Sequence, residues 1–312
     1  MSKLLSCRNR LVIVLVMTLA LLDTGPCFGL GHKSCKGGWI KKKMFGHKMI
    51  ILGDSNFVFV MKEFVAKFQT ISRVQKVAQY GGCQSFRHFN MDINPADVVW
   101  RSGKEQGIIA GPYSSGLRTP FCSDCTSCSS EIYDLTHKVT NTTLRLEYFP
   151  LLFSKDVTVQ SRKYKTTQEH LVAYLKASGY GPLDYIVFNV GLHEMSHITP
   201  LQYGENLQFF SKLLTTVDAN LIFINTPHSN LPGLPKGFDV MYTVELTDQY
   251  NAVASEVLAR NHKVIGTVDT APESLVGTEF SQYYKDGHHF LLNSTFYNAV
   301  MMKTLYTVCS LA

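Results

Sequence analysis

One short segment of the sequence has the composition of a serine nucleophile at a strand-to-helix turn. Gly53, Asp54 and Ser55 directly follow an apolar run at residues 49–52. Glycine permits a tight turn, and a serine at the start of the next helix lies beside backbone amides that stabilise developing negative charge. Asp and Ser are also common helix caps, so the segment alone predicts either a nucleophile or a cap.

A candidate base and its partner lie near the other end of the chain, in the segment Asp286, Gly287, His288 and His289. A serine nucleophile needs a base that takes its proton, and that base needs an acceptor that holds one ring nitrogen. Asp286 and His289 can supply both from one loop. His288 would then be a neighbour of the site, a substrate contact or a surface residue. Isolated histidines are more often structural, so this segment predicts a catalytic base only in combination with Ser55.

Two further segments offer hydrogen-bond donors for an oxyanion. Gly191, which follows an apolar run at residues 184–188, allows close backbone approach, and either Asn189 or His193 can donate from its side chain. Gly81 and Gly82 follow another apolar run and are candidates through their backbone amides. The competing interpretation of both segments is an ordinary turn.

The elements that must position these residues alternate along the chain. Strands are predicted at residues 49–52, 74–80, 144–149, 185–190, 221–224 and 264–268. Helices are predicted at residues 57–68, 167–177, 203–216, 247–260 and 294–308. This alternation favours a three-layer α/β/α fold with a mainly parallel central sheet, flavodoxin-like in its layers. Binding and catalytic groups collect at the carboxyl edge of such a sheet, where the candidate segments would meet.

The central part of the chain, about residues 84–143, has turn composition and no periodicity, and we expect an irregular, cysteine-containing insertion that forms a lid or a cap. Its cysteines are expected to form disulfides in an oxidising compartment, with a pairing that the sequence does not fix. The candidates for disulfides are Cys35, Cys83, Cys122, Cys125, Cys128 and Cys309. A zinc site at Cys122, Cys125 and Cys128, completed by His137 or another residue, is the alternative.

The N-terminus has the pattern of a secretory signal. Lys3, Arg8 and Arg10 precede an uncharged run at residues 11–22, which is shorter than the roughly 20 residues of a membrane-spanning helix. We expect a signal peptide at residues 1–29, or a short signal anchor, then a basic segment at 30–48 and one domain at 49–312. Asn141 and Asn293 begin glycosylation sequons. The predicted location is therefore outside the cell or in the lumen of the ER or Golgi, with no stable membrane span after cleavage.

Composition narrows the class of partner. The chain has 312 residues, 45% of them hydrophobic, which is enough for a large core. Its net charge of +6 is too mild to indicate nucleic-acid binding. Six lysines between residues 33 and 48 are interpreted as a solvated entry segment, with an anionic glycan or membrane surface as the alternative partner.

Taken in order, these motifs are similar to those of the SGNH hydrolase superfamily. The sequence has Gly-Asp-Ser after the first strand, a glycine turn after the second, Asn-x-Gly-x-His after a central strand and Asp-x-x-His before the last helix. Over about residues 45–312 it most resembles the PC-esterase type, in particular the C-terminal domain of the neurexophilin-and-PC-esterase proteins. Cys309 in the last helix is part of that resemblance.

The resemblance implies a role for each candidate residue. Ser55 would be the nucleophile, His289 the general base and Asp286 its orienting acid. Oxyanion donors would be the Ser55 amide, a Gly81 or Gly82 amide, and a side chain of the third segment. There the usual Gly-x-Asn-Asp becomes Gly191-Leu192-His193-Glu194, which leaves the donor open between His193 and Asn189.

The function implied is a carbohydrate O-acyl esterase or O-acyltransferase, with acetyl as the expected acyl group and a glycan or glycoconjugate as the substrate. No cofactor is expected, although a transferase would need an acetyl donor such as acetyl-CoA. The main alternative is a non-catalytic extracellular binding protein that retains the fold. A third interpretation makes His288, His289 and the cysteine cluster metal ligands. The sequence fixes neither the acceptor nor the oligomeric state.

Overall fold

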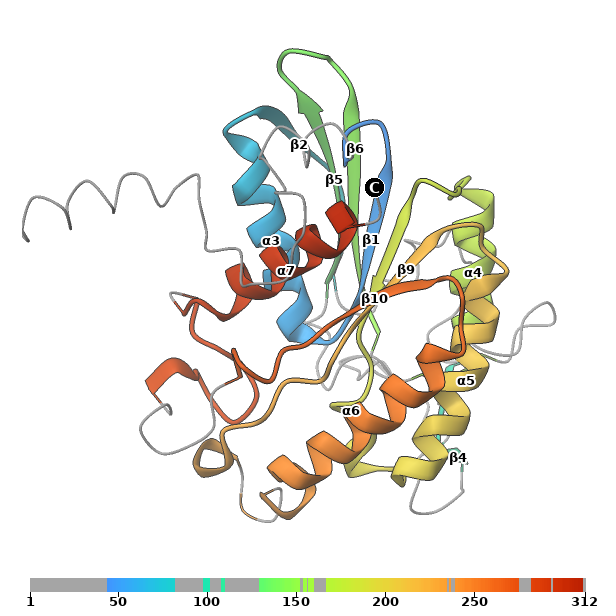
Figure 1. Cartoon of the computed structure of the whole chain (residues 1–312), viewed down its shortest axis with the longest axis vertical. Helices are drawn as coiled ribbons and strands as arrows, with labels where there is room; N and C mark the ends of the chain where they lie inside the picture. Colours follow the sequence, from blue (N-terminus) through green and yellow to red (C-terminus); the bar gives the residue numbers. More distant parts are fainter. Residues whose placement is uncertain are drawn as a thin grey trace, which may run out of the picture.

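A seven-stranded sheet forms the centre of the protein (Figure 1). The computed structural model describes residues 44–81, 98–101, 108–109, 129–151, 154–155, 157–159, 167–234, 236, 239–274, 282–292 and 294–310. The strand order is β10-β9-β8-β1-β6-β5-β2. Their bounds are β1 Lys48–Gly53, β2 Ser72–Gly81, β5 Ser129–His137, β6 Thr143–Pro150, β8 Tyr185–Phe188, β9 Asn220–Ile224 and β10 Val264–Val268.

The sheet is mainly parallel, as the sequence predicts. Strands β10, β9, β8, β1 and β6 run in one direction, and β5 is antiparallel to both of its neighbours, β6 and β2. The carboxyl ends of the five parallel strands therefore lie at one edge. β1 is in the middle of the sheet, so a residue that follows β1 can be approached from the loops of several strands.

Helices cover both faces of the sheet, which gives the predicted three layers (Figure 1). On one face lie α3 and α7, and on the other lie α4, α5 and α6. Their bounds are α3 Ser55–Gln69, α4 Thr167–Ala177, α5 Pro200–Thr215, α6 Val244–Ala259 and α7 Phe296–Ser310. None of the helices in the described ranges combines the length and the apolar character that crossing a bilayer requires.

Strand β1 connects the two hydrophobic cores. Its side chains alternate between the faces of the sheet, so Met49 and Ile51 pack with α3 and α7 while Ile50 and Leu52 pack with α4, α5 and α6. All four are fully buried. A continuous apolar run is the pattern that a central parallel strand produces, because both of its faces are covered.

The structure corrects one prediction about the fold. The insertion expected at about residues 84–143 is not irregular throughout: residues 129–137 form β5, an internal strand of the main sheet, and the turn and start of β6 follow it. Two charged residues, Glu131 and Asp134, interrupt the apolar pattern of β5. Glu131 is nevertheless buried, because the Tyr133 hydroxyl donates to it at 2.7 Å and Lys76 lies 3.4 Å away. Tyr133 lies on β5 itself, but Lys76 belongs to the neighbouring strand β2, and a cross-strand partner is not visible in the sequence of one strand.

A second, three-stranded sheet of order β4-β3-β7 also draws on this region. Its strands are β3 Val98–Arg101, β4 Ile108–Ile109 and β7 Val157–Val159. Five of the six cysteines proposed for disulfides lie outside the described residues, as do residues 1–43, Gly82 and the sequon residue Asn293. The sixth, Cys309, is buried in α7. The disulfide pairing therefore stays a prediction.

Candidate active site

Ser55 lies at the first position of α3, directly beyond the carboxyl end of β1. Asp54 is the N-cap of this helix, and its side chain accepts a hydrogen bond from the Asn56 amide at 2.8 Å. A side chain at Gly53 would place a Cβ 2.7 Å from the ring of Phe57, so the turn requires glycine. The Tyr148 hydroxyl lies 3.2 Å from the Gly53 carbonyl and 2.9 Å from that of Asp54. Asp54 is thus a cap, as one interpretation predicts, and the same cap presents Ser55.

His289 meets Ser55 although 234 positions separate them in the sequence. The Ser55 Oγ lies 2.5 Å from His289 Nε2. On the other side of the ring, His289 Nδ1 lies 2.8 Å from Asp286 Oδ2 and 3.0 Å from Oδ1. A carboxylate at Nδ1 favours the tautomer with the proton on that atom, which leaves the lone pair of Nε2 facing the serine. The three residues predicted to converge therefore do so, in the order that proton transfer from Ser55 requires.

The carboxylate of Asp286 is fixed by the loop that carries it. Its Oδ1 accepts hydrogen bonds from the backbone amides of His288 and His289, both at 2.9 Å. Partial burial alone would raise the pKa of Asp286, but these amides and the His289 ring together lower it below its ordinary value. The side chains of His289 and Asp286 are 33% and 45% exposed, so both are open to a ligand.

The two side chains proposed as oxyanion donors occupy different surroundings. Asn189 is buried and its Nδ2 donates to the Ile224 carbonyl at 2.8 Å, so it ties β8 to β9. Burial, together with smaller contributions from the charges of His288, His197 and His289, lowers the pKa of His193 to about 3. The His193 ring is therefore neutral at physiological pH, and the choice between His193 and Asn189 as the oxyanion donor stays a prediction.

Gly191 allows a close backbone approach, as its residue type predicts. Its φ of +137° lies in a region that other residues rarely adopt, and a Cβ there would come within 2.4 Å of Thr226 Oγ1. The close approach lets the chain turn sharply after β8. The turn continues into the 3-10 helix η4 Glu194–Ser196.

The prediction that a Gly81 amide contributes to the site is wrong in its geometry. Gly81 ends β2, which is separated from β1 by β6 and β5. With neighbouring strands about 4.8 Å apart, the two strands are on the order of 14 Å from one another. The sequence order of strands misled the prediction, because β6 and not β2 lies beside β1. The segment after β6 is the one next to the nucleophile turn, where the Leu151 amide donates to the Gly53 carbonyl at 2.9 Å.

Glu194 is a residue of this edge that the sequence reasoning missed. It is fully buried, and its Oε1 accepts from the backbone amide of Ser154 at 2.9 Å and from the Ser154 hydroxyl. Glu194 therefore connects the segment after β6 to the segment that carries His193. Its position in the sequence could have identified it, because Glu194 is a charged residue directly after His193, in the segment that follows a buried strand.

His288 lines the site without contacting the serine. Its Nδ1 lies 2.8 Å from Ser229 Oγ, and its ring packs edge-on against Tyr242 with centroids 4.4 Å apart. The pKa of His288 is lowered to about 4, mainly by burial and also by the charge of His289, while the charge of Asp286 opposes the shift. The ring is therefore neutral at physiological pH. Of the nearby aromatic residues, Tyr284 and Tyr297 are buried in the core and Tyr283 is exposed.

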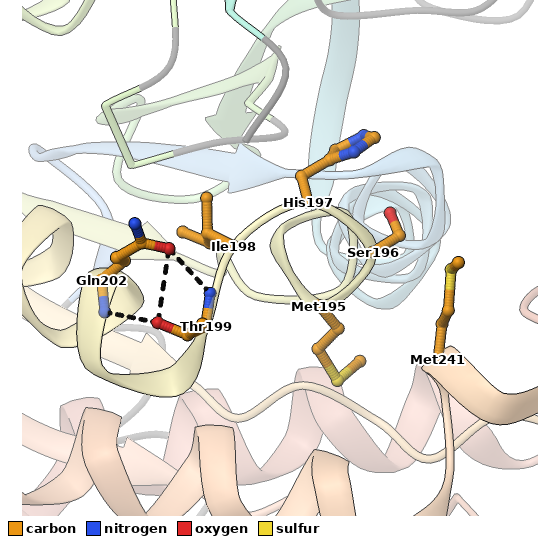
Figure 2. A pocket seen from close by; sticks show the side chains of 7 residues that line it. All are labelled: Met195, Ser196, His197, Ile198, Thr199, Gln202 and Met241. Carbon is orange, nitrogen blue, oxygen red and sulfur yellow. Dashed lines mark hydrogen bonds between the residues drawn. The ribbon is translucent and has the colours of Figure 1, made fainter. Parts of the chain in front are cut away.

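A pocket of about 310 Å³ is lined by residues 195–199, Gln202 and Met241 (Figure 2). Met195, Ile198 and Met241 give it an apolar lining, and Ser196 and His197 add polar groups. Met241 ends the 3-10 helix η6 Asp239–Met241, directly before Tyr242. Burial raises the pKa of Tyr242, and a hydrogen bond with Ser196 opposes this shift in part. Tyr242 thus lies between the pocket and His288.

The interpretation of His288 and His289 as metal ligands gains no support from their contacts, which are with Ser229, Ser55 and Asp286. Within the described ranges, no three or more His, Cys, Asp or Glu side chains are grouped as a metal site requires. The cysteine cluster proposed for zinc lies outside those ranges.

Comparison with known proteins gives similarity at the level of structure only. No protein-family profile matches the sequence, and no curated protein sequence matches it. An acetylxylan esterase mutant from Geobacillus stearothermophilus is 11% identical with a TM-score of 0.43, over 85% of this chain and 94% of that one. A GDSL-like lipase from Bacteroides thetaiotaomicron is 11% identical with a TM-score of 0.42, over 85% and 87%. A peptidoglycan O-acetylesterase is 10% identical with a TM-score of 0.47, over 88% and 96%. These values are too low to transfer a substrate or a mechanism.

Proposed function

We propose that the protein is a serine-dependent O-acyl esterase or O-acyltransferase of the SGNH superfamily, of PC-esterase type. The observation that carries the proposal is the contact of Ser55 with His289 at 2.5 Å, with Asp286 on the opposite ring nitrogen. A serine at a helix start and a base held by a carboxylate are the parts that acyl transfer needs. The superfamily assignment rests on these residues and on the sequence motifs that carry them.

In the proposed reaction, Ser55 Oγ attacks the ester carbonyl while its proton passes to His289 Nε2. The bond from carbon to the leaving oxygen then breaks, and His289 returns the proton to that oxygen, which leaves an acyl group on Ser55. Water or a sugar hydroxyl attacks the acyl-enzyme next and gives its proton to His289. The acyl group leaves with the acceptor, and Ser55 regains its proton. The two activities differ only in which acceptor enters.

We propose two groups of this edge as oxyanion donors, the Ser55 amide and the His193 side chain. The Ser55 amide is at the first turn of α3, where backbone N–H groups have no partner within the helix. The His193 ring is neutral at physiological pH, because burial and, to a smaller extent, neighbouring histidines including His289 lower its pKa. A neutral imidazole can donate a hydrogen bond without the electrostatic cost of a second positive charge beside His289.

The proposed substrate is an acetyl ester on a glycan or glycoconjugate, in the secretory pathway or outside the cell. The resemblance to PC-esterases supports it, as do the signal-like N-terminus and the sequons. The exposed fractions of His289 and Asp286 are consistent with a large substrate, because an ester on a polymer can reach a base that is one third exposed. As a transferase the protein would use an acetyl donor such as acetyl-CoA.

Active-site labelling tests the proposal. The purified protein is incubated with a fluorophosphonate probe, and intact mass and peptide mapping follow the adduct. We expect one adduct on Ser55 that is absent from Ser55→Ala and present in Ser274→Ala, a variant of a buried serine. Incubation with acetylated glycans, or with an acetyl donor and free glycans, then separates esterase from transferase. A wild-type protein that stays unlabelled would favour the non-catalytic binding protein instead.

A further inference from the structure

The loop that carries His289 is joined to the nucleophile helix by one buried amide side chain. Asn56 follows Ser55 in α3 and is fully buried. Its Nδ2 donates to the backbone carbonyl of His288 at 3.1 Å, across 232 positions of sequence. Its Oδ1 accepts from the Tyr297 hydroxyl at 3.1 Å. Both ends of the Asn56 amide are therefore used to connect separate parts of the chain.

Tyr297 completes the connection from the other side of the base. It belongs to α7, is 1% exposed, and its hydroxyl oxygen accepts from the Phe290 amide at 3.2 Å. The Phe290 carbonyl lies 3.1 Å from the same hydroxyl, which has one proton for this carbonyl and for Asn56 Oδ1. The peptide groups that flank His289, the carbonyl of His288 and the amide of Phe290, are thus both held by the Asn56–Tyr297 pair.

This arrangement matters because His289 lies in neither a helix nor a strand of the sheet. A base on a loop must still be held to a fraction of an ångström for efficient proton transfer. Phe290 stacks on Phe296 with centroids 3.6 Å apart, which fixes the loop against α7 through apolar contact. Hydrogen bonds are directional and stacking is much less so, so Asn56 and Tyr297 help to set the rotation of the peptides that flank His289. Within the loop itself, the Lys285 amide donates to the His289 carbonyl at 2.7 Å and the His289 amide donates to Asp286 at 2.9 Å. Asn56 and Tyr297 add the connection from this loop to α3 and α7.

We propose that Asn56 and Tyr297 are positioning residues that hold the base loop on the nucleophile helix and so set the contact between Ser55 and His289. The inference rests on the proposed function for its effect on rate. Neither residue contacts the reacting atoms. They act through the backbone on both sides of the base.

Kinetics of four variants test the proposal. Asn56→Ala should lower kcat by about 10- to 100-fold with KM changed less than about threefold, since an ångström of misplacement costs that much. Tyr297→Phe should lower kcat by about 3- to 10-fold. The double variant should be no slower than Asn56→Ala, because both residues act through one network. The control is Asn261→Ala, whose amide also donates to a carbonyl and accepts from a backbone amide, at the amino edge of the sheet.

Each kinetic outcome either supports or overturns the proposed positioning role of Asn56 and Tyr297. An Asn56→Ala protein that is folded by circular dichroism and keeps the kcat of Asn261→Ala would overturn the proposal. A loss confined to KM would overturn it as well, because it would make Asn56 a binding residue. Losses that multiply in the double variant would show two independent effects and no shared clamp. If Asn56→Ala does not fold, Tyr297→Phe carries the same comparison.

Amide hydrogen exchange gives a readout that does not depend on the proposed function. Peptides that cover residues 286–291 should exchange at least tenfold faster in Asn56→Ala and in Tyr297→Phe than in Asn261→Ala, with the rest of the sheet unchanged. Unchanged exchange in that loop would overturn the positioning role even in an active enzyme. If Ser55→Ala keeps full activity, the proposed function fails, and the exchange data still decide whether the clamp exists.

Discussion

Ser55, His289 and Asp286 can be compared with a second set of the same residue types, Ser274, His228 and Asp248. In that set the Ser274 Oγ lies 3.3 Å from His228 Nδ1, and His228 Nε2 lies 2.9 Å from Asp248 Oδ1. In the first set the corresponding distances are 2.5 Å and 2.8 Å. Judged by residue types and connectivity, the two sets are alike.

They differ in access and in the direction of the serine proton. Ser274 is fully buried and donates its hydroxyl proton to the Thr270 carbonyl at 2.9 Å, so that proton does not face the histidine. His228 is 7% exposed, whereas His289 is 33% exposed. Ser55 lies at a helix N-terminus, and Ser274 lies in a turn after β10. A ligand can therefore reach the serine and the histidine only in the first set, and the Ser274 proton is directed at a carbonyl instead of at the histidine.

The largest expected effect comes from the two serines. Ser55→Ala should lower kcat/KM for an acetyl ester by roughly a thousandfold or more, because the oxyanion donors remain but no acyl-enzyme can form. Ser274→Ala should stay within about twofold of wild type. Steady-state hydrolysis of an aryl acetate by both variants measures this. If kcat/KM fell equally in the two variants, the assignment of catalysis to the first set and not to the second would be wrong.

A smaller loss is expected from the carboxylates. Asp286→Asn places an NH₂ or a carbonyl oxygen at His289 Nδ1, which weakens control of the tautomer and removes the charge that stabilises the imidazolium. We expect kcat to fall by about 10²- to 10⁴-fold. Asp248→Asn is the matched control and should leave kcat unchanged. If Asp286→Asn kept at least half of the wild-type kcat, Asp286 would not be the residue that orients His289.

The sequence predicts the first set well because its signals are local. Gly53, Asp54 and Ser55 follow a fully apolar strand, and Asp286 lies three residues before His289. The serine segment and the aspartate-histidine segment can therefore each be recognised from a short stretch of sequence. Their meeting follows from the parallel sheet, since both segments must lie at its carboxyl edge. The predicted strands and helices agree with the structure in type and in approximate bounds.

The sequence does not reveal the order of the strands in the sheet or the contacts between residues that are far apart in the chain. Gly81 was a sensible oxyanion candidate only if the second strand in sequence were also the neighbour of β1, and that neighbour is β6. Asn56 reads as a polar residue in the first turn of a helix, and its partners His288 and Tyr297 are more than 200 positions away. Contacts of this kind are set by packing of the whole domain, which no local pattern records.

The histidines near the accessible set predict a pH dependence of stability. The pKa values of His193 and His288 are lowered to about 3 and about 4, against about 6.5 in an unfolded chain. Between pH 6.5 and 4 the unfolded chain therefore binds protons that the folded protein does not, and the free energy of unfolding falls as pH decreases through this window. The expected loss is about 1–2 kcal/mol per histidine at pH 5.

Urea unfolding at pH 7 and pH 5 measures the effect. Asp54, whose pKa is raised by burial despite opposing hydrogen bonds and the His289 charge, acts in the opposite direction, so variants are needed to isolate the histidines. His193→Gln should lose part of the pH dependence, and His262→Gln, at an exposed position, should keep it. A His193→Gln protein with the full wild-type slope would contradict the assigned shift. Asp286 does not contribute here, because its lowered pKa keeps its stabilisation intact until the pH falls below about 4.

The smallest expected effect belongs to the second set. Asp248 is 60% exposed, so water and salt screen its interaction with His228, and removal of its carboxylate leaves Nε2 within reach of water. Asp248→Ala should therefore lower the free energy of unfolding by only about 0.2–1 kcal/mol at pH 7, and less in 0.5 M salt. Ser274→Ala is the comparison, because it removes the hydroxyl partner of the buried His228 Nδ1 and should cost about 1–3 kcal/mol. If Asp248→Ala proves the more damaging of the two and its cost does not fall with salt, then the second set is a tightly coupled buried network, and its difference from the first lies in access alone.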